Sequence, residues 1–237
     1  SKQESSVLSI LKEYIQLLNN KSQIWNEDYH AIPQDKNFVY EDSRYQLKLS
    51  FPNLIGKHQI ENAATSIATL SSIDDVKISD KDFETGLSNA LWPGRLEKLE
   101  FGPLNKYVSS ETEIWIDGGH NEHAAIAIAD TMKDYKDKKL ILIMAMMNTK
   151  DSKKFLNPFV NLASHVIAIK IPNSENSLSP NVIKQSSEIQ GVSAITKNDL
   201  YEALEHTKSF NGKIRILICG SLYLAGFVLE KHRGRAI

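Results

Sequence analysis

A polar segment with two glycines is the strongest candidate for chemistry in this sequence. The residues Asp-Gly-Gly-His-Asn at 117–121 follow an apolar run that ends at Ile116, and a helical pattern begins at Glu122. Ligands of open α/β sheets bind beyond the carboxyl ends of the strands, and glycines let the backbone approach a ligand closely. Because a helix N-terminus favours anions, the segment predicts a binding site for a negatively charged ligand.

Arg95 could bring a cation to such a site. It follows Trp-Pro-Gly at 92–94, a sequence typical of a turn. The planar guanidinium of arginine can hold a phosphate through two parallel hydrogen bonds. We therefore interpret Arg95 as a candidate phosphate ligand.

Two more apolar runs end in polar residues, at 148–151 and 219–221. If the sheet is parallel, these strand ends and the 117–121 segment share one edge, which is the best evidence for a site in the residues themselves. Lys150 could neutralise a substrate carboxylate or be a solvated lysine beside a helix-capping aspartate; the sequence leaves both open. Asn62, early in a helix, could cap locally or hold a ligand through its amide.

Other chemistries have weaker support. Asp117, His120 and His123 could hold a transition metal, but no second spaced set of His or Cys accompanies them, so we predict no metal held by this chain. Ser221 lacks the Gly-x-Ser-x-Gly elbow of a nucleophile, and Cys219 ends a buried strand. The phosphate-binding Walker sequence is absent, so a triphosphate cradle is not expected in this chain.

The composition narrows the class of protein. The chain has 237 residues, 41% of them hydrophobic, with one cysteine and a net charge of -1. No apolar run approaches the roughly 20 residues that span a membrane, and the N-terminus lacks the pattern of a signal peptide. The single cysteine suits a reducing cytoplasm, and the balanced charge argues against nucleic-acid binding. We therefore expect a cytoplasmic protein of one or two domains.

Hydrophobic periodicity predicts two parts that meet near Pro93. The first part has helices and one hairpin, and the second alternates apolar strands with helices, which predicts a Rossmann-like, mainly parallel α/β sheet with flanking helices. Helices are expected at 5–19, 56–72, 79–91 (capped by Asp80), 122–135, from 151, and at 181–190, 199–208 and 222–231. Strands are expected in a 38–51 hairpin, at 96–101 paired with 107–109, and at 114–116, 140–146, 165–171, 192–195 and 214–219. The segments 24–33 and 173–180 are expected to be irregular.

Five motifs together resemble one enzyme family. They are Gly-x-His-Gln-x-x-Asn-Ala at 56–63, Trp-Pro-Gly-Arg-Leu-Glu at 92–97, Ile-Asp-Gly-Gly-His-Asn at 116–121, Thr-Lys-Asp at 149–151, and Gly-Ser-Leu-Tyr-Leu-Ala-Gly at 220–226. In this order they closely resemble folylpolyglutamate synthase, including the bacterial enzymes that are also dihydrofolate synthases, in the Mur ligase superfamily. One departure is Gly119, where that family usually has alanine.

The resemblance implies a domain organisation. Residues 1–91 would be the C-terminal part of the central ATP-binding domain of a Mur ligase, with an α+β arrangement. Residues 92–237 would be the complete C-terminal, glutamate-ligase domain. The phosphate loop, the magnesium ligands and most of the pterin site would lie in an N-terminal portion outside this chain, which begins at Ser1. We therefore expect a fragment that is inactive alone.

The family's reaction is ATP-dependent amide formation. A folate or dihydropteroate carboxylate is phosphorylated, L-glutamate attacks the acyl phosphate, and phosphate leaves. The resemblance thus implies ATP and Mg²⁺ as cofactors and a monomeric acid–amino-acid ligase. The missing N-terminal portion would be a partner of this chain, and no contact with nucleic acid or membrane is implied.

Site residues follow from the resemblance by position. Asn62 would lie near adenine, Arg95 would contact ATP phosphate across the domain cleft, and Asp117 would bind the nucleotide through ribose. The substrate-binding residues for glutamate would be His120, Asn121, Lys150 and Ser221, and the catalytic residues would be Arg95 and His120.

Two alternative functions stay open. The chain could belong to a peptidoglycan Mur ligase, which shares the domain plan, although the 56–63 and 220–226 motifs favour folate. It could also be a non-catalytic remnant or binding module, because half of the ATP site would be absent.

Overall fold

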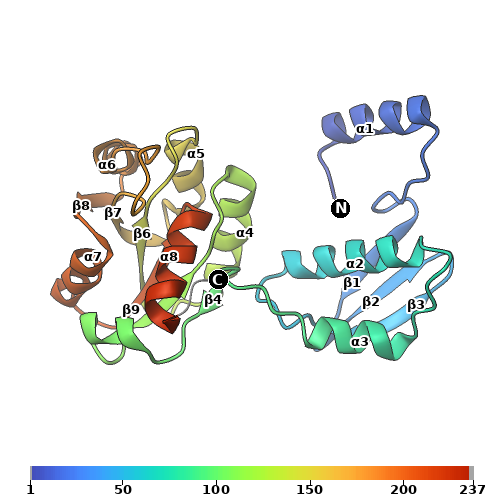
Figure 1. The fold of residues 1–237 in the computed structure, drawn as a ribbon, viewed down its shortest axis with the longest axis horizontal. Coiled ribbons are helices and arrows are strands. Elements are labelled where there is room, and N and C mark those ends of the chain that lie inside the picture. Colours follow the sequence, from blue (N-terminus) through green and yellow to red (C-terminus); the bar gives the residue numbers. More distant parts are fainter. Residues whose placement is uncertain (1, 235–237) are drawn as a thin grey trace. The chain divides into compact units, whose positions relative to one another are not determined.

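The chain folds into two compact units whose boundary lies between Leu91 and Trp92. The computed structural model describes residues 2–234. We call the first the N-unit and the second the C-unit, and Figure 1 shows both. Each unit has a hydrophobic core of its own.

The N-unit contains a three-stranded antiparallel sheet and helices. The strands, in the order β1-β2-β3, are β1 (Tyr29–Pro33), β2 (Asn37–Asp42) and β3 (Gln46–Ser50). The helices are α1 (Ser5–Leu18), α2 (His58–Ser71) and α3 (Asp80–Ser88). Alternate residues of the strands, such as Phe38, Tyr40 and Leu47, are buried in one cluster with Ile60 and Ile67 of α2. The predicted hairpin is confirmed, and the period-two burial that the alternation implies is present.

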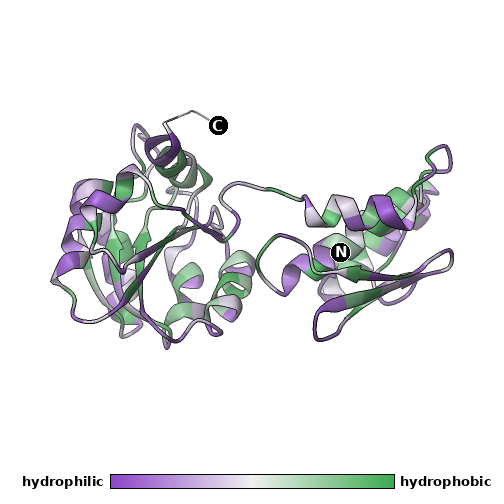
Figure 2. Cartoon of the chain, turned by 90° about the horizontal axis from the view of Figure 1, so that it is seen from below, coloured by the Kyte–Doolittle hydropathy of each residue, from purple (hydrophilic) through white to green (hydrophobic). Residues whose placement is uncertain are grey.

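The C-unit contains a six-stranded sheet in the order β4-β5-β9-β6-β7-β8. Its strands are β4 (Glu97–Lys98), β5 (Glu113–Ile116), β6 (Lys139–Met144), β7 (Ala163–Ala168), β8 (Ser193–Thr196) and β9 (Ile214–Cys219). All neighbouring pairs are parallel except β4 with β5. Figure 2 shows the strands as the apolar centre of this unit, as expected for strands buried on both faces.

Helices cover both faces of this sheet. They are α4 (Glu122–Met132), α5 (Ser152–Leu156), α6 (Pro180–Ile189), α7 (Leu200–His206) and α8 (Leu222–Arg233). One core cluster joins every second strand residue, such as Ile141 and Ile216, to Leu204 of α7 and Val228 of α8. The intervening strand residues point to the opposite face, where α4, α5 and α6 contact one another in series. The predicted doubly wound α/β arrangement is therefore confirmed.

Some local predictions were wrong. The 24–33 segment, expected to be irregular, contributes β1 because its residues pair with β2 from Tyr29 to Pro33. The α3 cap is Ser79 and not Asp80, because the Ser79 hydroxyl accepts from the N–H of Asp82 in a capping box. The 173–180 segment, by contrast, is irregular as predicted until α6 begins at Pro180, and its Leu178 N donates to Met146 O at 2.7 Å.

The expected pairing of 96–101 with 107–109 was also wrong. Residues 103–107 form a 3₁₀ helix, η1 (Pro103–Tyr107), with proline at its start. Glu97 and Lys98 instead pair antiparallel with Ile116 and Trp115 of β5. The residue run that carries Arg95 is thereby placed beside the strand that ends at Asp117.

Among residues 2–234, no helix combines the length and the apolar composition that a bilayer crossing requires.

Candidate functional site

Three polar strand ends meet at one edge of the C-unit sheet. Strands β5, β9 and β6 are neighbours and run parallel, so their carboxyl ends lie together, as the sequence predicted. Asp117 N donates to Ile218 O at 2.9 Å, and Gly220 N donates to Gly119 O at 3.0 Å. The segments after β5 and β9 are thus joined directly through their backbones.

Asp117 organises this edge through its carboxylate. Its Oδ2 accepts from Leu96 N at 2.8 Å and its Oδ1 accepts from Gly119 N at 2.5 Å. Gly118 N also donates to Gly94 O at 2.8 Å. The side chain is 6% exposed, so the carboxylate serves as an internal link between the turn at 94–96 and the end of β5. Sequence reasoning assigned it only to nucleotide and missed this structural role.

Opposing effects act on the pKa of the Asp117 carboxyl group. Burial raises the pKa of Asp117 above its ordinary value, while the N–H groups of Gly119 and Leu96 and the charges of Arg95 and His120 oppose that rise. The carboxylate therefore has two hydrogen-bond donors and the permanent charge of Arg95 in partial compensation for its burial.

Gly118 provides the surface against which Arg95 lies. A Cβ atom on Gly118 would stand 3.3 Å from Arg95 Nη1 and 2.3 Å from Leu222 Cδ2. Leu222 is the first residue of α8, so the guanidinium, the end of β5 and the start of α8 converge here. Sequence reasoning did not identify Leu222, because nothing in its type distinguishes it from other helical leucines.

His120 is partly buried at the same edge. Its Nδ1 lies 3.1 Å from Gly118 O. Because a carbonyl oxygen can only accept, Nδ1 carries the proton, and Nε2 of the neutral imidazole keeps its lone pair. Asn121, the next residue, is exposed and caps α4 by accepting from Ala124 N at 2.9 Å. The capping bond gives Asn121 a structural role that the glutamate-binding prediction did not include.

Ser221 caps α8 in an analogous position. Its Oγ accepts from Tyr223 N at 3.2 Å, and the residue is only 2% exposed. Gly220 before it has φ +98°, and a Cβ there would lie 2.6 Å from Ala145 O, so glycine is required. Because Gly220 N donates to Gly119 O, the residues just before α4 and α8 are neighbours, and the positive dipole ends of both helices come to one place.

The remaining two predicted site residues have different surroundings. Lys150 is exposed in the turn after β6, where its backbone N donates to Met147 O at 3.0 Å. No hydrogen bond between described residues joins its side chain to the other predicted residues. Asn62 belongs to the N-unit, is exposed, and donates from Nδ2 to Gln59 Oε1 at 3.0 Å within α2.

Glu97 is a second residue that sequence reasoning left without a role. Its Oε2 accepts from Gly94 N at 3.0 Å, and its Oε1 accepts from the guanidinium of Arg233 in α8. The signal was present in the Trp-Pro-Gly-Arg-Leu-Glu motif, but its partners lie too far along the chain to be identified from spacing.

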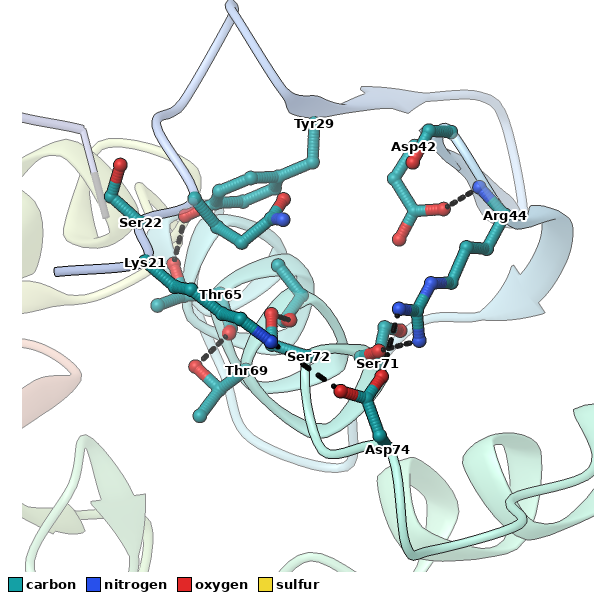
Figure 3. A pocket seen from close by; sticks show the side chains of 13 residues that line it. Lys21, Ser22, Tyr29, Asp42, Arg44, Thr65, Thr69, Ser71, Ser72 and Asp74 are labelled. Carbon is teal, nitrogen blue, oxygen red and sulfur yellow. Dashed lines mark hydrogen bonds and ion pairs between the residues drawn. The ribbon is translucent and has the colours of Figure 1, made fainter.

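The N-unit contains a separate cavity, shown in Figure 3, of about 350 Å³. Arg44 and Lys21 approach Asp74 at 3.1 and 3.5 Å, and the hydrogen bond from Arg44, then the charge of Lys21, lower the pKa of Asp74. Tyr29 and Thr65 share a hydrogen bond of 3.2 Å on another wall. Both cations thus already have an ion-pair partner in the ionised carboxylate of Asp74. None of the predicted site residues lines this cavity.

Within residues 2–234, no group of three or more His, Cys, Asp or Glu side chains is arranged to hold a metal ion.

The C-unit matches a known protein domain. Residues 97–231 match the family described as dihydrofolate synthetase, C-terminal domain. Over 242 residues the chain is 26% identical to the dihydrofolate synthetase of Saccharomyces cerevisiae, covering 97% of this chain and 55% of the yeast protein. It is 28% identical over 223 residues to the dihydrofolate synthase/folylpolyglutamate synthase of Bacillus subtilis, covering 91% of this chain and 48% of that enzyme.

The same fold is found in solved structures. A bifunctional folylpolyglutamate synthase/dihydrofolate synthase with Mn, AMPPNP and L-glutamate bound is similar with a TM-score of 0.77 and 20% identity. The similarity covers 93% of this chain and 50% of that one. The chain spans about half the length of the curated relatives it matches.

Proposed function

Because this chain belongs to the family of the dihydrofolate synthetase C-terminal domain, we propose that it forms the C-terminal part of an ATP-dependent glutamate ligase. The ligase joins L-glutamate to a folate, to dihydropteroate, or to both. We assign residues 92–237 to the glutamate-ligase domain and residues 1–91 to the last part of the central ATP-binding domain. Similarity over more than nine-tenths of the chain to two folate enzymes supports this over a peptidoglycan ligase.

One observation carries the proposal: Arg95 and His120 lie close enough to Asp117 to act on its carboxylate, and the residues before α4 and α8, which include Ser221, are joined by the hydrogen bond from Gly220 N to Gly119 O. The arrangement suits anionic substrates, because it combines a guanidinium with the positive dipole ends of two helices. ATP and glutamate are both anionic. The Mn, AMPPNP and L-glutamate in the similar solved structure are consistent with that use.

Arg95 is proposed to act on phosphate. ATP supplies the phosphoryl group that activates the folate carboxylate, and phosphoryl transfer depends mainly on positioned cations. The guanidinium of Arg95 is always charged and lies beside the backbone of Gly118. Asn62 is proposed to contact adenine, and Asp117 contributes to nucleotide binding through the lone pairs that its two backbone donors leave over.

Glutamate is proposed to bind at the start of α4 and α8. A carboxylate is favoured by the positive dipole end of α8 and can accept from the Ser221 hydroxyl, whose oxygen itself accepts from Tyr223 N. His120 keeps a lone pair on Nε2, which can accept a hydrogen bond or a proton from the amino group of glutamate. Asn121 and Lys150 flank this region, and Lys150 would act as a charge that attracts carboxylate.

The remaining features of the enzyme are proposed from the family. The magnesium ligands and the triphosphate cradle are placed in sequence outside this chain, and the enzyme is placed in the cytoplasm as a monomer. The buried, unpaired thiol of Cys219 is compatible with a reducing compartment. Sedimentation of the purified protein measures the oligomeric state.

The decisive experiment uses the complete ligase of which this chain is proposed to form the C-terminal part, called the encoded protein below. It measures ADP release with ATP, Mg²⁺, L-glutamate and one acceptor at a time. Tetrahydrofolate or dihydropteroate should support turnover that requires glutamate and is abolished by EDTA. Turnover with a UDP-muramoyl peptide instead would favour the peptidoglycan alternative. Absence of turnover with every acceptor, in a protein that binds neither ATP nor glutamate, would favour a non-catalytic remnant.

A further inference from the structure

The turn that carries Arg95 has an unusual backbone. Gly94 has φ +71°, and Leu96 has φ +44°. Arg95 therefore stands between two residues in the left-handed region. Glycine adopts this region freely, but a leucine does so only where surrounding contacts compensate for the strain. The conformation of Leu96 thus requires partners that hold the turn.

Two carboxylates bind alternate N–H groups of this turn. Glu97 Oε2 accepts from Gly94 N at 3.0 Å, and Asp117 Oδ2 accepts from Leu96 N at 2.8 Å. The carboxylates lie on either side of Arg95 in the hydrogen-bonding pattern. Because charge-assisted hydrogen bonds are stronger than neutral ones, they fix the backbone on both sides of the arginine.

Glu97 is itself held by α8. The guanidinium of Arg233, in the last turn of the helix, donates to Glu97 Oε1, and the Glu97 side chain is only 22% exposed. A Cβ on Gly94 would stand 3.5 Å from Ala225 Cβ of the same helix, so the turn also packs against it. The helix that begins at Ser221 thus reaches the Arg95 turn at two further places.

We propose that Glu97 is a positioning residue: its carboxylate, oriented by Arg233, holds the turn so that Arg95 is presented over Gly118 before a phosphate arrives. The inference rests on the proposed phosphate role of Arg95. Its physical basis is that the turn backbone is ordered beforehand, so binding does not have to order it. Glu97 touches no substrate in this scheme and acts only through the position of Arg95.

The test compares kcat and KM of Glu97→Ala and Glu97→Gln in the encoded protein. We expect Glu97→Ala to lower kcat about 10- to 100-fold, because a small misplacement of a positioned group has effects of this size. We expect Glu97→Gln to stay within about threefold of the wild type, because its amide oxygen still accepts from Gly94 N with a neutral bond. Glu230→Ala, which removes a surface ion pair with Lys231 on the same helix, is the matched control and should leave kcat unchanged.

A double mutant separates positioning from general stability. If Glu97 acts through Arg95, adding Glu97→Ala to Arg95→Ala should change kcat by less than about twofold. The proposal would be overturned if the kcat of the double variant fell by the product of the two single-variant losses. It would also be overturned if Glu97→Ala and Glu97→Gln lowered kcat equally.

A second measurement does not depend on ligase activity. Amide hydrogen exchange in wild type should show protection of Gly94 N–H that Glu97→Ala removes while the β5 and β9 amides stay protected. Unchanged Gly94 protection would refute the role of Glu97 even in a protein without ligase activity. If Glu97→Ala removes the protection of Gly94 N–H but the wild type has no ligase activity, the positioning role of Glu97 stands and only the proposed function is contradicted.

Discussion

Arg95 is the residue on which the proposed chemistry depends most. Its side chain is partly buried, it lies against Gly118, and its charge acts on Asp117. The structure gives it a defined position but only a small share of the core. Its removal should therefore affect catalysis much more than folding.

We expect Arg95→Ala to lower turnover of the encoded ligase by roughly 10²- to 10³-fold, the usual effect of losing one positioned group that stabilises charge in a transition state. The free energy of unfolding should change by about 1 kcal/mol or less, because the side chain is not part of the core. Steady-state kinetics and urea unfolding measure the two effects. Turnover close to that of the wild type would contradict the phosphate role.

Gly118 allows a second prediction about a single residue. In Gly118→Ala the new Cβ would meet Leu222 Cδ2 at 2.3 Å and Arg95 Nη1 at 3.3 Å. Leu222 is 48% exposed, so its side chain can move outward, and we expect a loss of about 1 kcal/mol in stability. Turnover should fall by more than this loss of stability can explain, because the methyl group crowds the Arg95 guanidinium.

Gly226→Ala is the matched control for this substitution. Gly226 lies within α8, and a Cβ there would have no heavy atom within 4 Å. Alanine should stabilise the helix by about 0.5–1 kcal/mol and leave turnover unchanged. Equal effects of the two substitutions on turnover would show that the space above Gly118 does not matter.

Among the elements of the C-unit, the beginnings of β5 and β9 are held by an ion network at the opposite end from the candidate site. Glu113 at the start of β5 accepts from Lys98 at 2.9 Å, from Arg215 of β9 at 2.8 Å and from Trp115 at 3.2 Å. Lys138 approaches the same carboxylate at 3.0 Å. The network therefore ties β4, β5, β9 and the segment before β6 together.

This network predicts a pH dependence of stability. Burial by itself would raise the pKa of Glu113, but the hydrogen bonds from Lys98, Lys138, Trp115 and Arg215 outweigh it and lower the pKa to about 2. A depressed carboxyl pKa stabilises the fold above the unfolded-state value, 4.5, and this stabilisation is lost as pH falls from there to about 2.

Glu113→Gln should remove that part of the acid sensitivity. We expect the wild type to lose at most about 3 kcal/mol through Glu113 between pH 5 and pH 2, since each pKa unit corresponds to about 1.4 kcal/mol. Urea unfolding at several pH values measures the difference between wild type and variant. Parallel pH profiles for the two proteins would mean that Glu113 has an ordinary pKa in the folded state.

At the scale of the whole chain, the affinity for ATP depends on how many of the nucleotide contacts the chain itself provides. Among the described residues 92–234 the site has one guanidinium, that of Arg95, and two helix N-termini, and the sequence lacks a Walker loop. We expect calorimetry of the 237-residue chain to show no saturable ATP binding below about 1 mM, since a few contacts at one side of a nucleotide give little affinity. Micromolar affinity together with glutamate ligation by this chain would contradict the assignment of a partial site.

Much of the site's location could be predicted because local patterns fix it. The apolar runs that end at Ile116 and Cys219 determine β5 and β9, and parallel pairing brings the residues that follow them to one edge. The geometry within the edge could not be predicted in this way. That Asp117 binds Leu96 N, and that Glu97 binds both Gly94 N and Arg233, depends on which of many possible donors the folded chain brings near.

The amino-acid order alone was sufficient for the α/β class, for the family resemblance and for the segments that hold Arg95, Asp117, His120 and Ser221. These depend on periodicity, turn residues and short motifs, which act over a few neighbouring residues. Folding in three dimensions decided that β1 exists, that β4 pairs with β5, and that Asp117 is an internal link as well as a candidate ligand. The reason is that hydrogen bonds and burial join residues such as Glu97 and Arg233, which lie at opposite ends of the C-unit sequence.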